Sequence, residues 1–151
     1  MHFYFVRGCG FRNWIHFDDI YQATSDIVVV VRDETGLHYE FTLLPGFRCN
    51  GGSVPWAFRW FVPSWSSTND LINIAYALHD AMYCSGLMHR DLSDDMLRGL
   101  LRDAGLSRLQ ASTVCYAVNK FAESHYNKDE YDSKPFVKMR MYIPKESPNA
   151  V

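Results

Sequence analysis

Residues 68–86, TNDLINIAYALHDAMYCSG, decide the fold, because they predict a helix of about five turns. Thr68 or Asn69 can cap the start of this helix, and Gly86 is a typical C-terminal stop. Apolar side chains recur at spacings of three and four residues, which places them on one face. We expect that face to be buried, and it is formed by Leu71, Ile74, Ala75, Leu78 and Met82.

Three polar side chains lie at the edge of the buried face. His79 and Tyr83 are four residues apart, and Asp80 and Tyr83 are three apart, so all three share one side of the helix. Buried polar groups need partners. One interpretation is a catalytic centre, and the other is a buried hydrogen-bond network whose members satisfy one another.

Length and composition favour one folded domain at residues 1–144 with a polar tail at 145–151, because 48% of the 151 residues are hydrophobic. A formal charge of −2 without a basic face does not indicate nucleic-acid binding. We find no signal peptide and no candidate membrane span, and therefore expect synthesis in the cytoplasm. The cysteines are far apart and we expect free thiols at Cys9, Cys49, Cys84 and Cys115.

The segments before the central helix favour β-structure. We expect a strand at 2–7 followed by irregular structure to residue 25. The β-branched run at 27–31 and the alternating run at 37–43 predict a hairpin with a turn between them. His38 alternates with apolar neighbours and is expected on the solvent side of its strand.

Further elements flank the central helix. Residues 56–62 predict a short aromatic helix that caps the core, and residues 91–104 predict a second long helix that ends at a glycine. A helix from 107 to about 126 should bury its apolar face, and residues 136–144 alternate as a strand. The predicted fold is α+β, with an N-terminal antiparallel hairpin or sheet, three to four helices and a C-terminal strand. The side chains expected to face inward from 107–126 are Leu109, Val114, Ala117, Val118 and Phe121.

The loop at residues 48–55, RCNGGSVP, is the second informative stretch. Two glycines beside Asn50 allow tightly turned backbone that can present carbonyl or amide groups to an ion or an oxyanion. A plain connector between a hairpin and a helix has the same composition. The loop by itself therefore leaves binding and connection open.

The order of these pieces resembles a known family. A hairpin, GFRCNGGSVP at 46–55, HDAMY at 79–83, an acidic helix and AVNKF at 117–121 follow one another as in the domain-of-unknown-function family 1353 of tailed bacteriophages and prophages. In that family Asp is usual where this chain has Asn50. The resemblance implies a phage- or prophage-derived protein, made in the host cytoplasm, whose partners are other virion proteins or further copies of itself.

The HDAMY helix and the glycine loop also show a remoter similarity to the calcium-dependent secreted phospholipases of the A-two type. It implies that His79 is a general base, that Asp94 orients it and that Tyr83 completes the catalytic set. It also implies a calcium ion held by the metal ligands Asp80, Asn50, Gly51 and Gly52. The expected activity is then a metal-assisted hydrolysis of a lipid or another ester, with the cell envelope as one source of substrate.

Two alternatives stay open. The His79-Asp80 pair also occurs in metal phosphohydrolases named for it, but these need a further His on an earlier helix, which the sequence does not indicate. The other alternative is a virion component without catalysis, in a tail or baseplate, whose His-Asp centre is a buried structural network.

Overall fold

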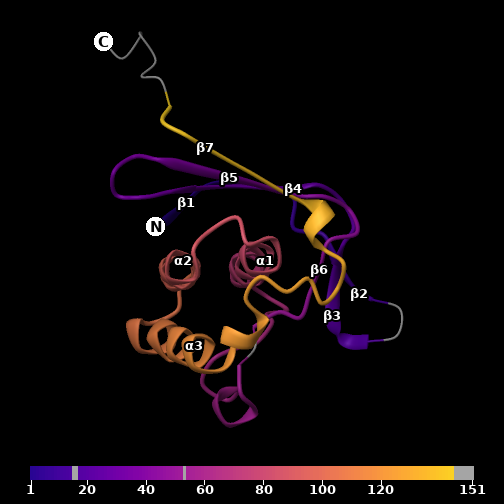
Figure 1. The fold of residues 1–151 in the computed structure, drawn as a ribbon. Helices are drawn as coiled ribbons and strands as arrows, with labels where there is room; N and C mark the ends of the chain where they lie inside the picture. The colour runs from indigo at the N-terminus through magenta and orange to yellow at the C-terminus, as the bar shows by residue number, and fades with distance from the viewer. Residues whose placement is uncertain (15–16, 53, 145–151) are drawn as a thin grey trace.

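The computed structural model describes residues 1–14, 17–52 and 54–144, so the predicted polar tail lies outside the described residues. These residues form an α+β fold, as predicted (Figure 1). The strands are β1 (His2–Arg7), β2 (Phe11–Trp14), β3 (Phe17–Ala23), β4 (Ile27–Arg32), β5 (His38–Leu43), β6 (Arg48–Cys49) and β7 (Val137–Tyr142). The α-helices are α1 (Asp70–Ser85), α2 (Arg90–Asp103) and α3 (Arg108–Phe121), and short 3₁₀ helices are η1 (Trp56–Phe58), η2 (Glu123–His125) and η3 (Lys134–Phe136).

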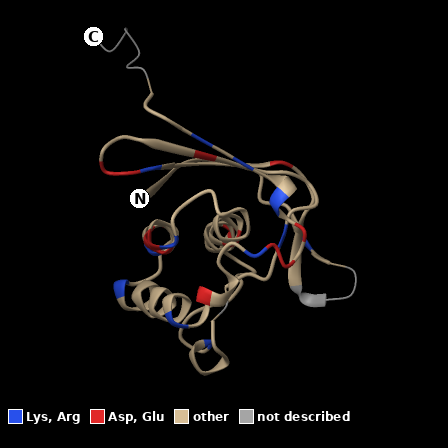
Figure 2. Ribbon diagram, viewed as in Figure 1, with Lys and Arg blue, Asp and Glu red and all other residues tan. Residues whose placement is uncertain are grey.

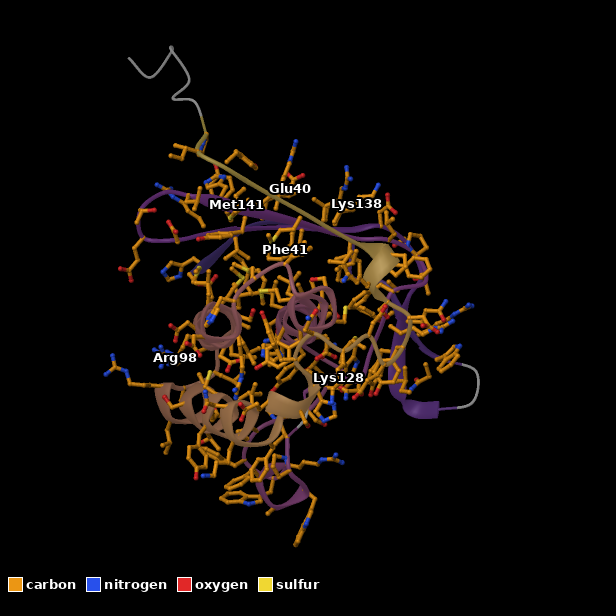
Figure 3. All side chains as sticks on the ribbon, in the orientation of Figure 1. Glu40, Phe41, Arg98, Lys128, Lys138 and Met141 are labelled. Atoms are coloured by element: carbon orange, nitrogen blue, oxygen red, sulfur yellow. The ribbon has the colours of Figure 1, made fainter. Side chains whose placement is uncertain are left out.

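The larger sheet contains the predicted hairpin, and its strand order is β1-β4-β5-β7 with every pair antiparallel. The C-terminal strand β7 joins this sheet beside β5. Successive side chains of a strand point to opposite faces. In Figure 3, Phe41 accordingly points toward the helices while Glu40 and Lys138 point away from them.

The helices lie in layers on one face of this sheet (Figure 1). Helices α1 and α2 lie directly under it, and α3 lies beyond them on the side away from the sheet. Burial of apolar side chains between these layers is the main favourable term in folding. The largest fully buried apolar side chains include Phe41, Leu43, Ile74, Leu78, Met82, Leu97, Leu100 and Leu101.

The central helix has the predicted ends. The Asn69 side chain accepts a hydrogen bond from Leu71 N at 3.1 Å, and Gly86 follows the last turn in a left-handed conformation with φ 64°. Helix α3 begins with a capping box, in which Ser107 and Gln110 each bond the other's backbone N–H. None of the described helices combines the length and apolar composition needed to cross a lipid bilayer.

The N-terminal prediction is wrong after residue 7. Instead of irregular structure, β2 and β3 pair as an antiparallel hairpin, and β6 adds to β3 as the third strand of a second sheet. The pairing with β6 joins segments that are distant in the sequence, in the pairs Tyr21–Cys49 and Gln22–Arg48. Local composition does not reveal such a partner, because strand pairing depends on tertiary context.

Three predictions about exposure are also wrong. His38 lies on the outer face of the large sheet but is only 3% exposed, because the rings of Tyr4 and Tyr142 cover it with centroids at 4.5 and 5.3 Å. Helix α3 ends at Phe121, and both Leu109 and Phe121 are exposed instead of buried. These two residues flank the buried stripe of Ala111, Val114, Ala117 and Val118.

The aromatic segment after Pro55 differs most from its prediction. It forms only the three-residue η1 and then turns, so the helix expected at 56–62 is wrong. Trp56 and Trp60 are each 84% exposed and do not cap the core. The four cysteines are free thiols, of which only Cys9 is fully exposed.

Candidate active site

The candidate site joins α1 to α2 through a buried hydrogen bond. His79 Nε2 lies 2.9 Å from Asp94 Oδ1, and the two side chains are 7% and 9% exposed. His79 comes from the middle of α1 and Asp94 from the first half of α2, which packs against it. The structure therefore brings together the two residues that the phospholipase resemblance assigns to general base and orienting acid.

Tyr83 completes this cluster. One turn after His79, its hydroxyl donates to the same Asp94 Oδ1 at 2.7 Å, and its ring packs on the imidazole with centroids 4.1 Å apart. Among the described residues, Asp94 Oδ2 is buried without a hydrogen-bond partner. The polar edge of α1 predicted from the sequence thus meets α2 at one carboxylate oxygen.

Hydrogen bonds decide the charge of Asp94. Burial by itself would raise the pKa of this carboxyl, but the bonds from His79 and Tyr83 outweigh burial and hold the pKa below its ordinary value. The nearby Arg90 guanidinium acts in the same direction. Asp94 is therefore an anion at neutral pH.

Asp80 lies on the next position of α1 and faces the glycine loop. The backbone N–H of Asn50 donates to Asp80 Oδ2 at 3.1 Å. When the Asn50 amide is oriented to satisfy both groups, its nitrogen donates to Asp80 Oδ2 at 3.1 Å and to the Gly51 carbonyl at 3.0 Å. The loop therefore offers this carboxyl two N–H donors.

The charge of Asp80 is governed by burial. Loss of hydration raises the pKa of this carboxyl to about 8, although the bond from Asn50 N–H lowers it and the charge of Glu130 raises it further. Asp80 is thus a neutral acid near pH 7. One turn of α1 therefore carries two groups of opposite role. His79 pairs with Asp94 of α2, and Asp80 faces the glycine loop as a protonated carboxyl.

The two glycines of the loop are required by backbone geometry and packing. Gly51 has φ +71°, and a Cβ there would lie 2.9 Å from the Ser64 carbonyl. A Cβ on Gly52 would lie 2.5 Å from the ring of Tyr76, whose hydroxyl donates to the Pro63 carbonyl at 2.7 Å. Gly52 N–H also donates to the Ser64 carbonyl at 2.7 Å. Packing alone therefore explains both glycines.

A pocket reaches both parts of the centre. The space open to the centre of a water molecule is about 60 Å³, which leaves room for water. His79, Tyr83 and Asp80 line it together with the loop at 50–52, whereas Asp94 lies behind His79 and does not line it. The imidazole can therefore contact a ligand in the pocket while its Nε2 stays with Asp94.

The segment at 125–133 forms the remaining wall, and sequence reasoning missed it. The polar residues after Asn127 predict an exposed link, and the sequence places His125 near the end of the helix expected at 107–126. In the structure His125, Lys128, Glu130 and Tyr131 all line the pocket. His125 Nδ1 lies 2.6 Å from Glu130 Oε1. Asn127 N–H, in the same segment, donates to the Tyr83 carbonyl at 2.8 Å, a long-range bond that nothing in the local composition indicates.

The predicted metal ligands were tested against the donors around Asp80. Asn50, Gly51 and Gly52 do lie beside it, but the loop directs N–H donors to its Oδ2, and a calcium ion needs about six to eight oxygen ligands. Within residues 1–14, 17–52 and 54–144, no three His, Cys, Asp or Glu side chains form a group that could hold a metal ion. With these donors Asp80 is a hydrogen-bonded carboxyl, and the calcium site stays a prediction.

Comparison with known proteins gives a family and no function. The family described as "Protein of unknown function (DUF1353)" matches residues 24–118, a stretch that includes the glycine loop, α1 and α2. No curated protein and no solved structure matches the chain. The functional argument therefore depends on the geometry of the centre.

Proposed function

The chain belongs to the domain-of-unknown-function family 1353, and from this premise we propose that it is a hydrolase of ester bonds in which His79 activates a water molecule. The observation that supports this proposal is the position of one imidazole. Its Nε2 bonds to the buried Asp94 at 2.9 Å, while the same ring lines a pocket with room for water. A general base needs both of these contacts.

His79 and Asp94 divide the work of the base. Because Asp94 is held as an anion, it favours the tautomer of His79 with the proton on Nε2 and leaves Nδ1 to accept a proton from water. The charge of Asp94 would also stabilise the imidazolium that forms. Tyr83 fixes the carboxylate through its hydroxyl and thereby acts as a positioning residue.

Asp80 supplies the complementary acid. A carboxyl with a pKa near 8 keeps its proton at neutral pH and can donate it to an oxygen that gains negative charge. Two carboxyls whose environments separate their pKa values in this way are typical of acid and base roles in one site. A calcium-assisted form of the proposal would need Asp80 ionised, and it predicts activity that rises with added calcium.

A second candidate function is a non-catalytic virion component of phage or prophage origin. Its support is that His79, Tyr83 and Asp94 satisfy one another and are buried, as a network that only joins α1 to α2 would be. Self-association or contact with other virion proteins would then be the function. The first candidate is preferred because the pocket at His79 serves no purpose in the second.

Hydrolysis of p-nitrophenyl butyrate and of a short-chain phosphatidylcholine tests the proposal, in EDTA and in calcium. We expect activity in wild type and a loss of about 100-fold or more in His79→Ala, because a positioned general base contributes about that factor. His89→Ala is the matched control, since His89 caps α2 at the surface and does not line the pocket. Absence of hydrolysis by folded wild type in both buffers would contradict the hydrolase and favour the virion component.

A further inference from the structure

The segment at 54–62, called the aromatic tip below, projects beyond α3 at the end of the molecule farthest from the large sheet (Figure 1). Trp56 and Trp60 are each 84% exposed, and Phe58 between them is 37% exposed. Several large apolar rings exposed on a few consecutive residues usually mark a surface that binds something. We therefore look for a binding partner that covers the exposed rings of the tip.

The charges around the tip favour a lipid surface as that partner. From Gly51 to Asn69 the sequence holds one charged residue, Arg59, and no acid. In Figure 2 the projecting loop carries blue but no red. Trp with a single cation is the composition that suits a membrane interface, where rings lie among headgroups and a cation contacts phosphate.

Part of the backbone of the tip is paired within the tip. Phe58 N–H donates to Pro55, Arg59 N–H to Trp56, and Phe61 and Val62 N–H both to Phe58. An unpaired N–H group in the apolar part of a bilayer costs several kcal/mol, so each of these internal bonds lowers the cost of insertion. A partner protein, which could pair open groups itself, does not impose this cost.

The tip also lies next to the candidate active site. A second hollow, of about 1210 Å³ including open solvent, is lined by Trp56, Arg59 and Trp65. Asn50, Gly52 and Tyr131 line both this hollow and the pocket at His79. The hollow beside the tip and the pocket at His79 therefore adjoin at these three residues.

We propose that the aromatic tip inserts into the interface of a lipid bilayer and presents lipid ester bonds to the pocket at His79. The membrane surface stands on the geometry above, and only the naming of lipid as substrate class rests on the proposed function. Trp56 and Trp60 are the two anchors, and Arg59 is the group that contacts phosphate.

Vesicle binding tests the tip without any turnover. We use full-length protein and vesicles of phosphatidylcholine with about one third phosphatidylglycerol, and measure flotation and the tryptophan emission maximum. Wild type should bind with a blue shift. The double variant Trp56→Ser, Trp60→Ser should lose at least about tenfold in vesicle binding, since membrane binding scales with buried apolar area. The matched control is Met141→Ser with Ile143→Ser, which removes exposed apolar side chains at the large sheet and should bind as wild type.

The outcomes separate this proposal from the proposed hydrolase. His79→Ala should bind vesicles as wild type does, so a hydrolase that fails leaves the membrane surface standing. No binding by wild type overturns the tip proposal even if soluble esters are hydrolysed. Equal binding by the folded double variant, or equal loss in the control, also overturns it. Self-association that the double variant abolishes, without vesicle binding, overturns it in favour of a protein interface.

Discussion

The candidate site holds one aspartate at each end, and the two are in opposite charge states near pH 7. At the α2 end, behind the pocket, Asp94 is buried but accepts hydrogen bonds from His79 and Tyr83, and its pKa is lowered. At the loop end, Asp80 accepts hydrogen bonds from the N–H groups of Asn50, and its pKa is raised to about 8. Burial raises the pKa of both carboxyls and prevails at Asp80, whereas the bonds from His79 and Tyr83 outweigh it at Asp94.

This difference teaches that burial and the groups around a carboxyl together decide which one can serve as a base partner and which as an acid. Asp94 has a neutral or cationic ring and a phenol as donors, with Arg90 nearby. Asp80 has amide donors and the negative Glu130 nearby. Changes at either end should therefore alter stability and pH dependence in opposite ways, which gives three tests of the comparison.

The largest effect is expected at the α2 end. Asp94→Ala leaves His79 Nε2 and the Tyr83 hydroxyl without their shared acceptor, inside the interface between α1 and α2. Removing one partner of a buried charged pair costs about 3–5 kcal/mol, so we expect the free energy of unfolding to fall by about 3 kcal/mol. Urea denaturation at pH 7 measures it.

The neighbouring residue provides the control for this test. Asp95 is 61% exposed at its side chain and forms an ion pair with Arg98 at 2.6 Å. Exposed ion pairs contribute little, and Asp95→Ala should change the free energy of unfolding by less than about 1 kcal/mol. Equal losses in the two variants would show that the network at Asp94 does not stabilise the fold.

The second effect is a pH dependence at the loop end. Between the ordinary pKa of an aspartate, near 3.8, and about 8, the folded chain holds a proton on Asp80 that the unfolded chain has lost. Stability therefore falls as pH rises through this window, by at most about 1.4 kcal/mol per unit. From pH 5.5 to 7.5 we expect a decrease of about 2 kcal/mol from this residue.

Asp80→Asn isolates that decrease. The amide has nearly the same shape and cannot ionise, so the variant should gain stability relative to wild type as pH rises from 5.5 to 7.5. Urea denaturation at the two pH values gives the difference, and other groups cancel when the variant is compared with wild type. A constant difference between the two proteins would mean that Asp80 is already ionised at pH 5.5, and would end the assignment of an acid role.

The sequence predicted most of the α2 end and little of the loop end. Caps at Asn69 and Gly86 fixed the central helix, and the three- and four-residue spacing placed His79 and Tyr83 on one side of it. Their partner Asp94 came from a resemblance, because helical spacing does not say which residue of another helix comes opposite. The hairpin and the C-terminal strand followed from period-two alternation.

What the sequence missed depends on contacts between distant segments. The β2–β3 hairpin gains its third strand from β6, and the pocket wall at 125–133 is held by the bond from Asn127 to Tyr83. The prediction that the aromatic segment is buried failed for a different reason. Aromatic content suggests a core position, but Trp56 and Trp60 are exposed at the surface. Hydrophobicity predicts that a side chain is more stable when buried, but the fold decides whether it is buried.

The smallest predicted change in stability concerns the Tyr83 hydroxyl at the α2 end. Tyr83→Phe keeps the ring packed on His79 and removes only the hydroxyl that donates to Asp94 at 2.7 Å. Loss of one such bond to a charged acceptor costs about 1–2 kcal/mol of unfolding free energy. Tyr116→Phe is the control, because Tyr116 is 62% exposed and its hydroxyl can bond to water.

A double-mutant cycle shows whether this bond acts through Asp94. In the Asp94→Ala background the hydroxyl has lost its acceptor, so Tyr83→Phe should become nearly neutral or stabilising, with a coupling of about 1 kcal/mol or more between the two residues. Independent costs would mean that Tyr83 stabilises the fold through ring packing alone. The low pKa of Asp94 would then depend on His79 and Arg90, the other groups that act on it in that direction.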